Sequence, residues 1–154
     1  MKSGWKTGNY AKMLMKMQVI NRSKVDVGIV TPKMHLRPNR SPIPMAQIYQ
    51  WMEEGTSDGH VPKRPTLRVA FSEYRPLFKI FAKNLMHSTV NEANYKKPLY
   101  DIGGAFSKLV KHKIMDLKNP ALSPYTIKTR VNVGTTNPLV DTGQLHDAVG
   151  FKVY

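Results

Sequence analysis

The chain has 154 residues, the size of one ordinary domain, and carries a formal net charge of +14. It contains no cysteine, which excludes disulfide bonds and thiolate metal sites. No run of about 18 apolar residues occurs, so the sequence predicts no membrane-spanning helix. The positive excess predicts an acidic partner, which is either nucleic acid or an acidic protein surface.

The N-terminal third predicts a short helix, a strand and a basic loop. Apolar residues recur at helical spacing over 9–17, with Lys12 and Lys16 opposite them, inside a possible N-terminal extension of residues 1–24. No unbroken apolar stretch follows the first lysines, so no secretory signal is expected. Residues 25–30 alternate like a strand with one buried face.

Two basic loops flank the next predicted helix. Residues 32–44 contain four prolines and no periodicity, which predicts a long loop. A helix over 45–54 should end at Gly55, and a second loop follows over 56–65. Glu53 and Glu54 end this helix, where two sequential acids are typically solvated or paired with cations rather than arranged for acid–base catalysis.

Two longer helices follow. The pattern over 66–91 begins at Thr66, a suitable N-cap, and should kink or break near Arg75 because Pro76 removes a backbone donor. The clearest helix covers 98–118. Its Gly103-Gly104 pair is unfavourable inside a helix and therefore predicts that another element packs closely there.

The C-terminal part predicts a loop-rich connection and a last strand. Residues 119–141 form the connection, in which 129–133 could be extended. A helical turn over 141–145 should be capped by Asp141 or Thr142. Alternating residues at the C-terminus predict a strand over 148–153 that pairs with 25–30. The fold expected is therefore a single α+β domain over 1–154, a small antiparallel sheet with two long helices on one face and long projecting loops.

Nothing in the sequence indicates catalysis, a cofactor or a metal. Phosphate-binding and nucleophile motifs are absent, and the five histidines lack the convergent spacing of a zinc site. Basic residues near aromatic ones, around Trp5 and around Tyr95 to Tyr100, leave a nucleic-acid-binding module as an alternative to a structural protein. No helix-turn-helix, RNA-recognition or zinc-finger signature accompanies them.

Several short phrases in a fixed order resemble a phage protein family. They are AQIYQWMEEGT at 46–56, VPKRPTLR at 61–68, LSPYTI at 122–127 and NPLVDTGQL at 137–145. This series is similar to the HK97 gp10-like and Mu G-like families of tail-completion and neck proteins. It covers roughly residues 44–153 and departs from the family at Thr66, where an aromatic or large apolar residue is usual.

The resemblance implies a structural virion protein that joins the head connector to the tail, assembled in the host cytoplasm. It implies a ring, of six copies, stacked between the connector and the tail tube or terminator, with possible contact to DNA in the channel. A tail terminator and a head-side adaptor remain open as closely related roles. Because a ring needs projecting segments, the two basic loops are the expected contact surface. Their candidate interface residues are Lys33, Arg37, Arg40, Lys63 and Arg64.

Overall fold

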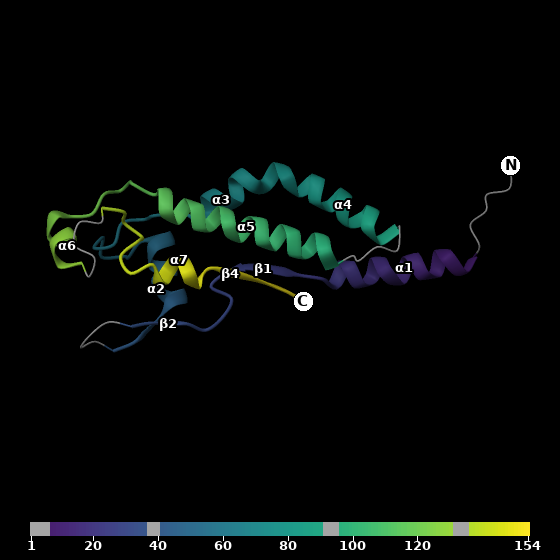
Figure 1. The fold of residues 1–154 in the computed structure, drawn as a ribbon, viewed down its shortest axis with the longest axis horizontal. Helices are drawn as coiled ribbons and strands as arrows, with labels where there is room; N and C mark the ends of the chain where they lie inside the picture. The colour runs from purple at the N-terminus through teal and green to yellow at the C-terminus, as the bar shows by residue number, and fades with distance from the viewer. Residues whose placement is uncertain (1–6, 37–40, 91–95, 131–135) are drawn as a thin grey trace.

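The computed structural model describes residues 7–36, 41–90, 96–130 and 136–154 and forms an elongated α+β domain (Figure 1). The predicted fold class is confirmed. The elements in chain order are α1 (Thr7–Arg22), β1 (Val25–Gly28), β2 (Met34–His35), β3 (Ile43–Pro44), α2 (Met45–Glu54), α3 (Leu67–Tyr74), the 3₁₀ turn η1 (Arg75–Leu77), α4 (Phe78–Val90), α5 (Lys96–Asp116), α6 (Pro124–Thr129), α7 (Gln144–Ala148) and β4 (Gly150–Val153).

The main sheet joins the two strands predicted from alternation. β1 and β4 pair antiparallel, with Val27 opposite Phe151 and Val25 opposite Val153. The pairing continues past the strands, because Lys24 and Tyr154 exchange backbone hydrogen bonds in both directions. The predicted loop over 32–44 is partly wrong, since β2 and β3 pair within it as a short hairpin, Met34 opposite Pro44.

Two layers of helices stack on this sheet (Figure 1). α5 packs against both strands, and α3 and α4 pack on α5. The close packing predicted at Gly103-Gly104 is confirmed, because a Cβ on Gly103 would lie 2.3 Å from the Phe151 ring. The glycine thus lets strand β4 approach helix α5 more closely than any other residue would.

The break predicted near Arg75 is also confirmed. α3 ends at Tyr74, η1 carries Pro76, and α4 begins at Phe78. Missing its backbone donor, Pro76 fits the first turn of a new helix better than a helix interior. Tyr74 of α3 contacts rings on both neighbouring helices, since it is stacked on Phe106 of α5 and on Phe81 of α4, each at 5.7 Å between ring centroids.

The buried core lies at the opposite end of the domain from α1. Met45 and Tyr49 of α2 meet Val110 and Ile114 of α5, and Leu145 of α7 joins them. The other members of the cluster are Ala70, Phe106, Leu139, Ala148 and Val149. These side chains are at most 8% exposed, so this region carries the main hydrophobic stabilisation of the fold.

Two local predictions are wrong, and a third is confirmed only in part. The first helix runs over Thr7–Arg22, well beyond 9–17. Neither Asp141 nor Thr142 caps α7, because Gly143 occupies the N-cap position with a φ of 79°. Thr66 is the N-cap residue of α3, as predicted, but its side chain accepts no capping hydrogen bond. Within the proposed extended piece 129–133, Thr129 ends α6, and residues 131–133 lie outside the described residues.

Candidate assembly interface

The basic residues proposed as interface contacts have different environments. Lys33 and Lys63 are exposed, and Lys33 also donates from Nζ to the Asp147 carbonyl oxygen at 3.0 Å. Arg37 and Arg40 lie outside the described residues. Of the three candidates that are described, the two lysines are exposed enough to meet a partner surface, and Lys33 would do so from a position fixed by its own hydrogen bond.

Arg64 corrects the expectation, because it is 5% exposed and serves the fold. Its Nε donates to the Pro120 carbonyl at 3.2 Å and its Nη2 to the Ala121 carbonyl at 3.4 Å. Its backbone N–H donates to Met52 O at the end of α2. Burial lowers the pKa of this guanidinium from its usual value, and the nearby charge of Arg130 acts in the same direction. Arg64 ties the 56–65 segment to the chain after α5 and does not project.

A second arginine ties the following stretch of chain. Arg130 Nη1 donates to the carbonyls of Asn137 and Val140, and its Nη2 donates to Pro138. The Asn137 side-chain amide in turn donates to the carbonyls of Ile114 and Met115 at the end of α5. Backbone outside helices and sheets lacks a regular set of hydrogen bonds for its carbonyl groups. Arginine can satisfy several of these carbonyls, because one guanidinium carries several N–H donors.

Glu53 caps a helix that is remote in sequence. Its Oε1 accepts from the backbone N–H groups of Thr66 and Leu67 and from the Thr66 hydroxyl, and its Oε2 accepts from the Arg68 N–H. Tyr49 closes the network through its hydroxyl, 2.9 Å from Thr66 Oγ1, and burial raises the pKa of this tyrosine. A carboxylate at a helix N-terminus satisfies free donors and complements the helix dipole.

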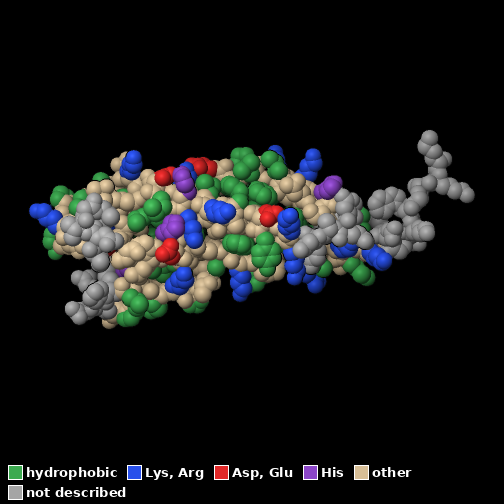
Figure 2. Space-filling view, viewed as in Figure 1, with side chains coloured by type: hydrophobic (Ala, Val, Ile, Leu, Met, Phe, Trp, Pro, Cys, Tyr) green, Lys and Arg blue, Asp and Glu red, His purple; other side chains and the backbone are tan. Residues whose placement is uncertain are grey.

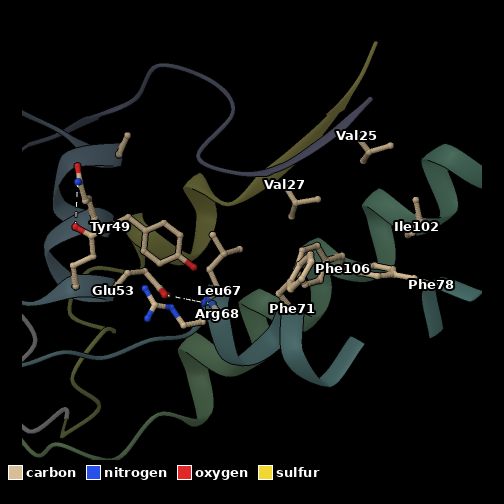
Figure 3. A pocket seen from close by; sticks show the side chains of 13 residues that line it. Val25, Val27, Tyr49, Glu53, Leu67, Arg68, Phe71, Phe78, Ile102 and Phe106 are labelled. Carbon is tan, nitrogen blue, oxygen red and sulfur yellow. Dashed lines mark hydrogen bonds between the residues drawn. The ribbon is translucent and has the colours of Figure 1, made fainter. Parts of the chain in front are cut away.

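A groove of about 640 Å³ opens between α2, α3, β1 and α5 (Figure 3). Its two ends differ in chemistry. Glu53 and Arg68 lie at the α2 end, whereas Phe78, Phe106 and Ile102 gather at the other. Phe71 is 50% exposed and forms a wall of the groove.

The ring of Phe71 is held in place by other aromatic residues. Its centroid lies 5.3 Å from that of Phe78 and 6.0 Å from that of Phe106, both in edge-to-face arrangements. Edge-to-face pairs of aromatic rings contribute interaction energy in addition to that of the apolar area they bury. These contacts therefore hold the exposed ring of Phe71 in one orientation. The groove therefore presents a fixed apolar surface, which is the usual form of a docking site.

α1 is a second surface with uncovered apolar side chains. It extends beyond the body of the domain and packs chiefly on α4 (Figure 1). Met13 and Ile20 are half-buried, whereas Leu14, Met15 and Val19 are 42%, 66% and 46% exposed. Lysines were expected opposite a single apolar face, but apolar residues occupy several sides of this helix. A helix that is apolar on several sides needs more than one packing partner.

Positive charge is spread out on the face shown in Figure 2. Lysine and arginine side chains occur along its whole length, with acidic and histidine side chains among them. A nucleic-acid interface would normally gather its cations into a stripe or patch. The face in this view shows no such gathering.

Other kinds of site find no support in the described part of the chain. Among residues 7–36, 41–90, 96–130 and 136–154, no three histidine or acidic side chains are grouped to hold a metal ion. None of the described helices combines the length and apolar character needed to span a membrane. Comparisons with protein-family models, curated proteins and solved structures gave no match.

Proposed function

We propose that this chain is a structural subunit of a phage neck, a tail-completion protein whose copies form a ring of six between the head connector and the tail. The proposal begins from the ordered phrases that resemble the tail-completion and neck families. It is supported by where the residues of those phrases lie, and by the apolar surface that the isolated chain leaves uncovered.

The residues of the phrases hold one another in place. Glu53, from the first phrase, caps the helix that begins at Leu67 in the second. Arg64, from the second, binds the backbone just before the third. Asn137 opens the fourth phrase and binds the end of α5. The residues of the phrases thus make the contacts that connect separate segments of the fold. Members of a structural family would share such contacts, whereas members of a catalytic family would share reactive groups.

The observation that carries the proposal is the amount of uncovered apolar surface in so small a domain. Exposed large apolar side chains occur on α1, along α3 and α4, and elsewhere on the described chain. They include Leu14, Met15, Val19, Val69, Phe71, Leu77, Ile80 and Met86. Contiguous apolar patches on soluble monomers are typically small and mark interaction sites. A subunit of a closed ring would cover such surface on two sides.

The test is the mass of the purified protein by light scattering at low and high salt, with and without duplex DNA. A discrete oligomer that persists at high salt and ignores DNA is expected, because packed apolar area holds it together. Electron microscopy of that oligomer should show rings. A monomer that binds DNA tightly, with affinity falling steeply as salt rises, would overturn the proposal and identify a nucleic-acid-binding module instead.

A further inference from the structure

We infer that α1 of one copy docks in the α2–α3 groove of the next copy, and that this contact links the subunits head to tail. The α2–α3 groove is the one lined by β1, α2, α3 and α5, with Phe71 in its wall. The inference rests on the proposed ring and names the surfaces that would close it. It requires an outward face on α1, a groove of matching chemistry, and an arrangement that prevents a copy from filling its own groove.

The outward face of α1 is a single stripe. Lys12, Met15, Val19 and Arg22 follow one another at helical spacing, so they lie along one side of the helix. All four are exposed. Met13 and Ile20, seven residues apart, form the half-buried side instead. The stripe therefore offers two apolar side chains with a cation at each end, and the packing on α4 leaves it uncovered.

The groove offers the complementary surface. Its apolar wall can receive Met15 and Val19 against Phe71 and its neighbours, and the flexible methionine suits an irregular pocket. Laying the apolar face of an amphipathic helix into such a groove is a recurrent mode of recognition, and a 16-residue helix extends about 24 Å.

Charge identifies α1 as the occupant. The chain is strongly basic overall, yet α2 carries Glu53 and Glu54 and no lysine or arginine. Both acids line the groove, together with the single cation Arg68. α1 carries Lys12, Lys16 and Arg22 and no acidic residue. A basic helix and an acidic groove wall on the same chain attract each other between copies, whereas basic surfaces elsewhere repel.

The placement of the two surfaces favours contact between copies. α1 extends away from the body beyond β1, while α2 and α3 lie further along the molecule (Figure 1). Each copy thus offers a helix at one end and a groove elsewhere. A contact between two different surfaces of identical chains is heterologous, and it closes into a ring when the rotation between copies allows.

Cross-linking tests the inference directly, because the chain has no cysteine of its own. Met15→Cys on α1 and Gln50→Cys in the groove are made as separate single variants on differently tagged full-length chains, mixed, and treated with a short bis-maleimide. Tyr125→Cys, 77% exposed on α6 and outside the groove, replaces Gln50→Cys as the matched control. A docked helix has a high effective concentration, so the Met15–Gln50 dimer should exceed the Met15–Tyr125 dimer by about tenfold.

A second measurement probes the charge. Glu54→Lys reverses an exposed acid of the groove wall, and it should lower the Met15–Gln50 yield and favour smaller species in light scattering. Asp116→Lys, an equal change on an exposed acid of α5 outside the groove, should leave both unchanged. Equal losses in the two variants would overturn the inferred pairing of α1 with the groove.

The outcomes separate this inference from the proposed ring. Rings with a Met15–Gln50 yield no higher than the control would overturn the docking of α1 and leave the ring intact. A bridge within single chains of the Met15→Cys/Gln50→Cys double variant, with none between mixed single variants, would overturn it in favour of self-docking. A chain that stays monomeric at every concentration and forms no bridge would overturn both.

Discussion

The two ends of this domain are stabilised in different ways. At the end formed by α2, α6 and α7, short elements and irregular backbone surround a buried cluster. Glu53, Arg64 and Arg130 there bind backbone groups of other segments of the chain. At the other end, α1 and α4 are long and regular, but many of their apolar side chains are exposed. The core of the first end is buried within one chain, whereas the helices of the second end leave apolar side chains uncovered.

The contrast shows that regular secondary structure and stability need not coincide. A helix such as α1 still depends on packing, here on α4, for most of its stability, but it can satisfy its own backbone hydrogen bonds. Irregular segments cannot satisfy their own backbone groups, and here side-chain donors and acceptors supply the hydrogen bonds instead. Changes to the buried side chains that bind remote backbone should therefore destabilise the chain, and changes to the exposed side chains of α1 should mainly affect assembly.

The largest effect is expected for Glu53→Ala. This change removes the cap of α3 and leaves buried donors around Thr66 without their acceptor, so the free energy of unfolding should fall by about 3 kcal/mol. Urea denaturation followed by circular dichroism measures it. Glu54→Ala, the exposed neighbour, is the matched control, and an equal loss in both variants would contradict the capping role.

A smaller loss is expected for Arg64→Ala. Its two side-chain hydrogen bonds to the carbonyls of Pro120 and Ala121 disappear, which should cost about 2 kcal/mol of unfolding free energy. Lys63→Ala changes the adjacent exposed cation and should leave the midpoint of thermal unfolding in place. Equal destabilisation by Lys63→Ala and Arg64→Ala would show that positive charge in this segment, and not the hydrogen bonds of Arg64, explains the loss of unfolding free energy.

The smallest effect on the isolated chain is expected for the double change Met15→Ser and Val19→Ser. Both side chains are substantially exposed, so the unfolding free energy of the monomer should change by less than about 0.5 kcal/mol. The oligomer should nevertheless dissociate at a higher protein concentration than the unchanged chain, as measured by light scattering over a dilution series. A large loss of monomer stability would show that α1 is already covered within its own chain.

Features set by neighbouring residues could be predicted from the sequence. Alternation located β1 and β4, Pro76 located the break between α3 and α4, and the Gly103-Gly104 pair located the approach of another element to α5. Each of these signals depends on side-chain periodicity or on the conformational limits of proline and glycine.

The roles of Glu53 and Arg64 could not be predicted in this way. Glu53 acts 13 positions away, at Thr66, and Arg64 acts 56 positions away, at Pro120. No local pattern shows that Arg64 is buried while the adjacent Lys63 is exposed, so both residues were expected at an interface. The groove could not be predicted either, since its lining comes from segments that are distant in sequence, β1, α2, α3 and α5 among them.

The exchange of backbone hydrogen bonds between Lys24 and Tyr154 has a mechanical consequence. α1 runs almost in line with β1, so a pull on α1 along its axis passes directly into the strand (Figure 1). Hydrogen bonds in an antiparallel pair lie across the strand direction, and such a load strains them together in shear instead of opening them one by one. The β1–β4 pair is therefore the anchor through which tension on the projecting helix would spread into the body of the domain.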